Sequence, residues 1–141
     1  MKLVELKGDL FNVPSEYALA HCVSSDFRMG AGIALEFKKK FGSVQVLKNQ
    51  HKTPGEVAFI KFNSRHIYYL ITKKHYWNKP TITNFKNSLW ELKKQMQLAK
   101  VSKLAMPKIG CGLDRLAWCT VKNIIKSVFI DSEIKILIYY L

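Results

Sequence analysis

The amino-acid sequence predicts an α/β protein in which helices cover a mixed β-sheet. Segments with the spacing of strands and of helices interleave along the chain, and one pair of strand-like segments has the pattern of a hairpin. No repeat or linker interrupts them. At 141 residues, the chain is long enough for one well-packed core and too short for two ordinary domains. We therefore expect a single domain that covers residues 1–141.

The first third of the chain predicts two strands followed by a helix. Alternating residues over 2–7 predict a strand that ends at Gly8-Asp9, and residues 18–23 predict a second, short strand. Apolar residues at helical spacing follow Gly30-Ala31-Gly32, which opens the predicted helix. Gly42 stands where a C-cap glycine ends such a helix.

A hairpin and a long helix are predicted next. Residues 56–62 and 66–72 are strand-like and flank Asn63-Ser64-Arg65, which reads as the turn of the hairpin. After Pro80, apolar residues step by three and four and predict the clearest amphipathic helix of the chain. Its apolar positions are Ile82, Phe85, Leu89, Leu92, Met96 and Ala99.

The last third predicts a strand, a helix and a closing strand. Residues 104–106 form a short strand that leads into a glycine-rich motif. A helix follows over 116–128, where apolar residues recur at helical spacing. Residues 134–141 are rich in β-branched and aromatic side chains and predict the final strand.

The charge of the chain is strongly positive, with a formal net charge of +13. Such a charge predicts long-range attraction to polyanions such as nucleic acid and to nucleotide ligands. The alternative is that scattered lysines only keep the protein in solution. Basic residues are spread over several segments and form no tail, so general anion affinity is favoured over specific nucleic-acid readout.

Apolar runs and cysteines bear on the compartment and on membrane association. The longest apolar runs are far too short to span a bilayer, and the N-terminus has no signal-peptide hydrophobic block. The three cysteines are odd in number and form no CxxC pair, which fits a reducing compartment. We expect a protein of the nucleus, the cytoplasm or both, without membrane contact.

Two loops share a pattern that suits a phosphate ligand. Residues 28–33 and 110–114 each follow a predicted strand and open a predicted helix. Glycines let backbone amides turn toward a phosphate, and a helix N-terminus adds unpaired N–H groups and partial positive charge. The alternative is that the glycines only make tight turns, since neither loop matches the dinucleotide or Walker patterns. Two such loops at the carboxyl ends of strands together favour a diphosphate.

Longer stretches of the sequence resemble a known family. These are "KGDLF" (residues 7–11), "AHCVSSDFRMGAGIALEFKKKFG" (20–42), "YYLITKK" (68–74) and "MPKIGCGLDRL" (106–116). They closely resemble the macrodomains, and within them the branch of terminal ADP-ribose protein glycohydrolases, also called O-acyl-ADP-ribose deacylases. The resemblance implies a single three-layer α/β/α macrodomain with a mixed central sheet. It also implies that the chain binds ADP-ribose and ADP-ribosylated proteins, and releases ADP-ribose from modified glutamate or aspartate.

The resemblance implies two catalytic residues, Lys73 as nucleophile and Asp114 as acid and base. In this branch, the lysine attacks the anomeric carbon of the distal ribose, and the acid helps to resolve the covalent intermediate. An amine attacks only when neutral; Lys74 and partial burial favour that form of Lys73, whereas Asp114 opposes it. From the residues alone, Lys73 reads as a solvated lysine and Asp114 as a helix N-cap. No metal or diffusible cofactor is implied, because the lysine supplies the covalent chemistry.

The resemblance also implies a set of ligand-binding residues. Asp9 and Leu10 are expected at the adenine, although Asp9 alone reads as a turn former. Ser24 and the 28–33 loop are expected at the diphosphate and distal ribose. The full set is Asp9, Leu10, Ser24, Arg28, Met29, Gly30, Ala31, Gly32, Ile33, Thr72, Pro107, Lys108, Ile109, Gly110, Cys111, Gly112, Leu113 and Leu141.

The sequence departs from the macrodomain pattern in two places. Many macrodomains have an Asn before the first glycine-rich loop, and residues 21–26 contain none, which agrees with the lysine-using branch. His75-Tyr76-Trp77 is bulkier than the family pattern, so the acceptor preference stays open.

The sequence leaves three alternatives to this enzyme open. One is a non-catalytic reader of ADP-ribose or poly-ADP-ribose with the same pocket. Another is a module that binds polyanions such as RNA through the basic surface. The third is a phosphatase of ADP-ribose 1″-phosphate. In each case we expect a monomer.

Overall fold

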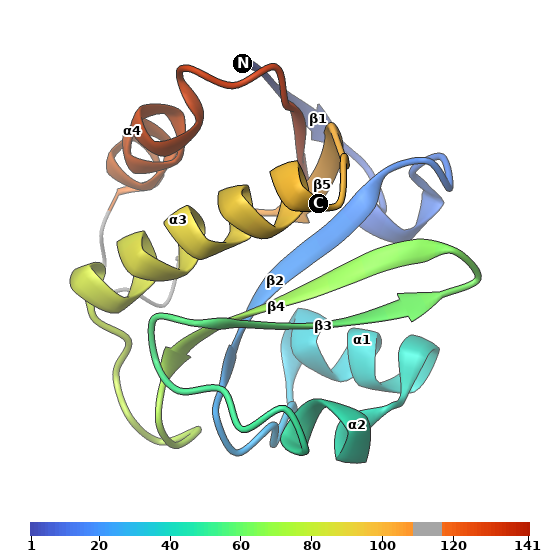
Figure 1. Ribbon diagram of the computed structural model, residues 1–141, viewed down its shortest axis with the longest axis vertical. Helices are drawn as coiled ribbons and strands as arrows, with labels where there is room; N and C mark the ends of the chain where they lie inside the picture. The colour runs from blue at the N-terminus through green and yellow to red at the C-terminus, as the bar shows by residue number, and fades with distance from the viewer. Residues whose placement is uncertain (109–116) are drawn as a thin grey trace.

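The computed structural model describes residues 1–108 and 117–141 (Figure 1). Strands and helices interleave within these residues, as the sequence predicts. The elements are β1 (Lys2–Lys7), a 3₁₀ turn η1 (Leu10–Asn12), β2 (Ala18–Ser24), α1 (Gly32–Phe41), α2 (Val44–Lys48), β3 (Val57–Phe62), β4 (Arg65–Lys73), α3 (Ile82–Leu98), β5 (Lys103–Pro107), α4 (Trp118–Phe129) and β6 (Lys135–Tyr140).

The strands form one mixed sheet in the order β1-β6-β5-β2-β4-β3. Strands β1, β6, β5, β2 and β4 run parallel to one another, and β3 pairs with β4 in antiparallel register. The predicted mixed sheet is therefore confirmed. Because parallel strands end at the same edge of a sheet, the carboxyl ends of β1, β6, β5, β2 and β4 all face one side of the molecule.

Helices cover both faces of the sheet, which confirms the α/β/α layering (Figure 1). On one face, α3 and α4 pack with buried residues of the sheet; on the other, α1, α2 and η1 do so. Phe85 on α3 and Phe37 on α1 are each fully buried. Burying a phenylalanine contributes roughly 2–3 kcal/mol, so each layer is held by its own apolar stripe.

The long amphipathic helix is present as α3. Thr81 is its N-cap, and the Thr81 side chain accepts a hydrogen bond from the backbone N–H of Asn84 at 3.1 Å. Phe85, Leu89 and Met96 recur on its buried face, as the spacing predicts.

The hairpin turn is shorter than predicted. Arg65 belongs to β4 and pairs with Phe62, so only Asn63 and Ser64 connect the strands. Both have positive φ angles, 49° and 69°, as in the two-residue turns whose twist matches that of a hairpin.

Helix α4 begins later than predicted. Its N-cap is Ala117, an extended residue, and Trp118 is the first helical residue. The helix predicted over 116–128 is thus observed over Trp118–Phe129. The predicted loop over 110–114 and the interpretation of Asp114 as a cap lie outside the described residues. Helix α2 was not predicted; it has only 5 residues and buries one of them, Leu47, so it carries little periodic signal.

The outer edge of β3 is covered by side-chain amides. Gln50 donates from Nε2 to the carbonyl of Phe59 at 2.7 Å and accepts from the Phe59 N–H at 3.1 Å. Gln95 of α3 donates to the carbonyl of Val57 at 3.2 Å. These bonds satisfy backbone groups that an edge strand otherwise leaves open.

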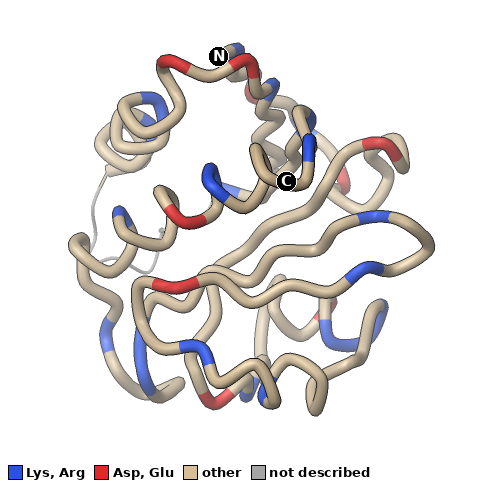
Figure 2. The backbone as a smooth tube through the Cα atoms, viewed as in Figure 1, with Lys and Arg blue, Asp and Glu red and all other residues tan. Residues whose placement is uncertain are grey.

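Basic residues lie in every layer of the described structure (Figure 2). The chain contains 23 Lys and Arg against 10 Asp and Glu, and no single element carries the excess. Among residues 1–108 and 117–141, no helix combines the length and apolar character needed to cross a bilayer.

Candidate functional site

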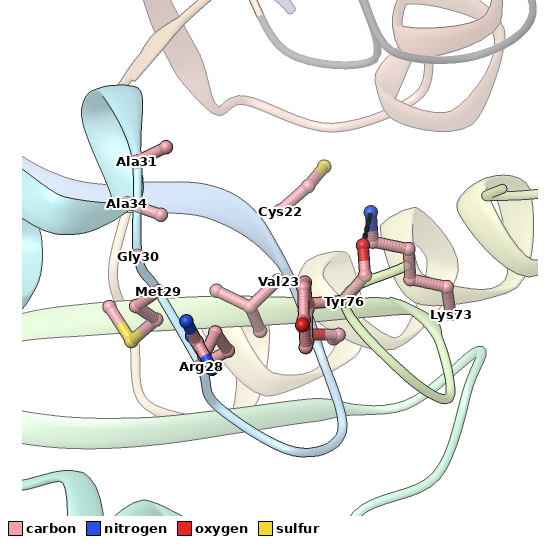
Figure 3. A pocket seen from close by; sticks show the side chains of 10 residues that line it. Cys22, Val23, Arg28, Met29, Gly30, Ala31, Ala34, Lys73 and Tyr76 are labelled. Atoms are coloured by element: carbon pink, nitrogen blue, oxygen red, sulfur yellow. Dashed lines mark hydrogen bonds between the residues drawn. The ribbon is translucent and has the colours of Figure 1, made fainter. Parts of the chain in front are cut away.

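Two cavities open at the edge where the parallel strands end. The first has a volume of about 330 Å³ and lies at the ends of β2 and β4, beside the loop that leads into α1 (Figure 3). Ala31 and Ala34 bring α1 to its wall. Its lining residues are Cys22, Val23, Ser24, Arg28, Met29, Gly30, Ala31, Ala34, Lys73 and Tyr76.

The second cavity, of about 630 Å³, lies at the ends of β1, β5 and β6. Helix α1 contributes to it as well, so this helix borders both cavities, whereas its preceding loop borders only the first. The lining residues are Gly8, Asp9, Leu10, Phe11, Ile33, Glu36, Lys40, Pro107, Lys108, Tyr139, Tyr140 and Leu141.

The backbone conformation of the loop between β2 and α1 depends on two non-glycine residues as well as on a glycine. Phe27 and Met29 have positive φ angles of 50° and 46°, and both side chains are buried in the core below the loop. Gly32, with φ of 58°, also needs a left-handed backbone, whereas Gly30 does not. The buried side chains of Phe27 and Met29 therefore fix a strained backbone conformation at the wall of the cavity.

Lys73 is the last residue of β4, half-buried at the wall of the first cavity. Its backbone carbonyl accepts from the N–H of Ser25 at 2.9 Å, across a bulge in the β2–β4 pairing. Its amine donates to the backbone carbonyl of Tyr76 at 3.0 Å, as Figure 3 shows. The amine is thus the one basic group from β4 that faces this cavity in the described residues.

Asp26 lies beside the first cavity, in the loop between β2 and α1, and also contacts Tyr76 in the loop that follows β4. Its Oδ1 accepts from the hydroxyl of Ser24 and from the N–H of Arg28 at 3.1 Å. Its Oδ2 accepts from the N–H of Tyr76 at 2.9 Å. Partial burial raises the pKa of Asp26, but these hydrogen bonds outweigh it, and the net pKa is below the usual value.

Tyr76 and Arg28 contact each other across the first cavity. The guanidinium carbon of Arg28 lies 4.7 Å from the centroid of the Tyr76 ring, a cation–π distance. Both side chains are exposed. Arg28 is therefore held by a ring at the cavity wall, where its charge is available to an anion.

In the second cavity, Asp9 caps the turn η1. Its Oδ1 accepts from the N–H of Phe11 at 2.9 Å. Lys108 lies 4.6 Å above the ring of Tyr140 and 3.9 Å from a carboxylate oxygen of Glu5. This cavity therefore combines an oriented carboxylate with aromatic walls and a cation.

Comparisons with known proteins decide the family. The Macro domain model matches residues 20–125. The chain belongs to the macro domain family. It is 53% identical to a human protein named ADP-ribose glycohydrolase OARD1 over 140 residues, 99% of this chain and 92% of that one. The bovine protein of the same name is 52% identical over the same shares.

A solved macrodomain has the same fold. The macrodomain of Thermus aquaticus DarG superimposes with a TM-score of 0.86 at 26% identity, and the match covers 99% of this chain and 98% of that one. The resemblance to the macrodomains and the expected three-layer fold are thereby confirmed.

Most of the site residues expected in this macro domain border the two cavities. Ser24, Arg28 and Lys73 line the first with residues 29–31, and Asp9, Leu10, Ile33, Pro107, Lys108 and Leu141 line the second. Two residues lie elsewhere: Gly32 lines neither cavity, and the hydroxyl of Thr72 is buried against the carbonyl of Val23 at 3.4 Å. Ile109, Gly110, Cys111, Gly112, Leu113 and Asp114 lie outside the described residues.

Several residues that border the cavities of this macro domain were not predicted from the sequence. Tyr76 was noted only as part of a bulky stretch, and Tyr140 only as part of a strand. Glu36 and Lys40 reach the second cavity from α1. Their spacing of four along a helix that follows the glycine loop was the one available signal. Among the described residues, no group of three or more His, Cys, Asp or Glu side chains is placed to hold a metal ion.

Proposed function

We propose that this macro domain is an ADP-ribosyl hydrolase. It releases ADP-ribose from esters with glutamate or aspartate and deacylates O-acyl-ADP-ribose. The observation that carries the proposal is the position of Lys73, whose amine stands at the cavity bordered by Ser24 and the loop over 28–31. The 53% identity to a protein named ADP-ribose glycohydrolase supports the same reaction.

The two cavities suit the two ends of ADP-ribose. We place the adenine in the second cavity, with its exocyclic amine donating to the Asp9 oxygen that Phe11 leaves available. The diphosphate lies along the loop over 28–31, where backbone amides and Arg28 oppose its charge. The distal ribose then lies in the first cavity, beside Lys73.

The lysine mechanism begins with attack of the neutral Lys73 amine on the anomeric carbon of that ribose. A C–N bond forms as the bond from the carbon to the ester oxygen breaks, and the carboxylate of the modified protein leaves. Water then adds to the anomeric carbon, and the C–N bond breaks to return the free amine. Asp114 moves the protons in this second step. In O-acyl-ADP-ribose, the ester to be hydrolysed is on the same ribose, which this placement puts beside Lys73.

The resting hydrogen bond of Lys73 has a consequence for this mechanism. The amine donates to the Tyr76 carbonyl. Once it is neutral, the amine can keep this bond through one N–H while its lone pair points at the anomeric carbon. The Tyr76 carbonyl can therefore orient the nucleophile during attack.

The proposal is tested with a protein ADP-ribosylated on glutamate, incubated with wild type and with Lys73→Ala. Wild type is expected to release ADP-ribose, and the variant to lose more than about a thousandfold in rate, as loss of a nucleophile does. Binding of free ADP-ribose, measured by calorimetry, provides the control for an intact pocket. Equal release by both proteins ends the lysine mechanism. Binding without release by wild type would instead identify a reader of ADP-ribose.

A further inference from the structure

One carboxylate joins the two loops that flank the first cavity. Oδ2 of Asp26 accepts from the N–H of Tyr76, 50 residues further along the chain, at 2.9 Å. Oδ1 of the same side chain stays within its own loop, where it accepts from Ser24 and from the N–H of Arg28. The two oxygens therefore have separate tasks, one across the loops and one within a loop.

Tyr76 is held at three points. Its N–H donates to Asp26 at 2.9 Å, its carbonyl accepts from the Lys73 amine at 3.0 Å, and its ring lies 4.7 Å from the Arg28 guanidinium carbon. The Tyr76 ring is exposed, and besides Arg28 it packs edge-on against Trp77, with centroids 5.2 Å apart; both of these side chains are themselves exposed. The hydrogen bond to Asp26 is the one that ties its backbone to the opposite loop.

We propose that Asp26 is a positioning residue for Lys73. It fixes the backbone of Tyr76, whose carbonyl in turn sets where the lysine amine waits beside the ribose. The inference rests on the proposed function, because it assigns Asp26 a part in bringing the Lys73 amine to the anomeric carbon. Asp26 itself contacts neither the substrate nor the reacting atoms.

Energetics favour this role for a carboxylate. A hydrogen bond from an N–H to an ionised acceptor is shorter and about twice as strong as a neutral one. Asp26 stays ionised because its pKa is below the usual value. The link across the loops therefore persists at neutral pH and below it.

Asp26→Asn separates the two tasks. The amide keeps one oxygen, which continues to accept from Ser24 and the N–H of Arg28, since Asn forms the same local turn as Asp. Its NH₂ then faces the N–H of Tyr76, where donor meets donor, and the link across the loops is lost. Asp26→Ala removes both tasks. Glu133→Gln is the control, since it neutralises one exposed carboxylate between α4 and β6.

The expected result is a split between rate and binding. Asp26→Asn should lower kcat for the glutamyl ester between about ten- and a hundredfold, while affinity for free ADP-ribose stays within about threefold. Asp26→Ala should lower both, because the amide of Arg28 also loses its acceptor. Glu133→Gln should match wild type in both measurements.

A measurement without substrate provides a second test. Amide hydrogen exchange at Tyr76 should be slow in wild type and faster in Asp26→Asn, because this N–H loses its acceptor. Wild-type kcat and wild-type exchange in Asp26→Asn would overturn the positioning role and leave the proposed function intact. Equal losses of kcat and ADP-ribose affinity in that variant would overturn it too, since Asp26 would then act through the binding loop. A wild-type protein that releases no ADP-ribose would overturn both proposals.

Discussion

The imidazole of His21 lies face to face on the ring of Phe37, with centroids 3.8 Å apart and planes 11° from parallel. His21 is fully buried between β2 and α1, one residue before the wall of the first cavity. Neither ring nitrogen has a hydrogen-bond partner among the described residues. Burial lowers the pKa of His21 to about 3, so the folded protein holds this ring neutral.

This buried ring makes stability depend on pH. The unfolded chain binds a proton at His21 near pH 6.5, and the folded protein binds it only near pH 3. The contribution of the neutral His21 ring to the free energy of unfolding is therefore complete above pH 6.5 and declines as the pH falls from 6.5 toward 3. Relative to His21→Phe, wild type should lose about 2 kcal/mol in free energy of unfolding between pH 8 and pH 5. Urea unfolding of both proteins at the two pH values measures this change, and a difference that does not vary with pH would contradict it.

Glu5 joins β1 to α4 and predicts a second stability effect. Its carboxylate accepts from the indole N–H of Trp118 at 2.6 Å and from the Lys122 amine at 2.7 Å. Trp118→Phe keeps an aromatic ring, although a smaller one, and removes the donor. Loss of this hydrogen bond should cost about 1 kcal/mol in free energy of unfolding, because the pair is partly exposed. Thermal unfolding at neutral pH measures the loss. In a Glu5→Gln background the same change should cost clearly less, since the charged acceptor is absent.

Glu5 also makes stability depend on pH, in this case through a carboxylate that is ionised in the folded protein. Its pKa is lowered from 4.5, first by the hydrogen bond from Lys122 and then by that from Trp118. The unfolded chain therefore takes up this proton at a higher pH than the folded protein does. The stabilisation is present above pH 4.5 and is lost as the pH falls through the folded-state pKa. The loss in free energy of unfolding caused by Glu5→Gln should accordingly become smaller as the pH falls below the folded-state pKa of Glu5.

The two glycines of the first loop should respond differently to alanine. Gly32 has φ of 58° with nothing near its missing side chain, so Gly32→Ala costs backbone strain alone, about 1 kcal/mol of stability. Gly30 is not left-handed, and a methyl group there would meet Arg28 Nε at 3.4 Å. Gly30→Ala should therefore leave stability nearly unchanged and weaken ADP-ribose binding at the cavity wall. Unfolding and calorimetry on both variants separate these effects; the reverse order of stabilities would contradict the assignment.

Asp114→Ala should reveal the covalent intermediate. If Asp114 moves the protons of the hydrolysis step, its removal should slow turnover by roughly a hundred- to ten-thousandfold and leave attack by Lys73 less affected. An adduct of Lys73 with ADP-ribose should then accumulate and be detected by mass spectrometry of the intact protein. The double variant Lys73→Ala/Asp114→Ala is the control and should form none. Absence of an adduct in the single variant, despite slow turnover, would argue for direct attack by water.

The sequence predicted the elements that have a long period or a clear cap. Helix α3 was predicted because its apolar face repeats over many turns after Pro80, and β4 because its strand pattern continues up to the lysine. Helix α2 has only 5 residues, too few to show a helical period in the sequence. The start of α4 depends on the extended backbone of Ala117, which the spacing of apolar residues does not reveal.

The site was predictable where it rests on contiguous motifs. Ser24, Arg28 and Lys73 lie in stretches that resemble the macrodomains, and they do border one cavity. The roles of Asp26 and Tyr76 were not predictable, because their hydrogen bond joins residues 50 positions apart and no spacing rule encodes it. Thr72 faces away from the cavity because neighbouring residues of a strand point to opposite faces, and Lys73 takes the cavity side.

The amides of Gln50 and Gln95 occupy backbone groups at the β3 edge of the sheet. A foreign strand that tried to extend the sheet beside β3 would need the N–H and C=O of Phe59 and the C=O of Val57. Gln50 and Gln95 already bond to them. Phe59 and Phe62 are exposed along the same strand and make its surface apolar. The two glutamines therefore keep backbone hydrogen-bonding groups of an apolar edge strand from pairing with another chain. Self-association through this border would first require both side chains to be displaced.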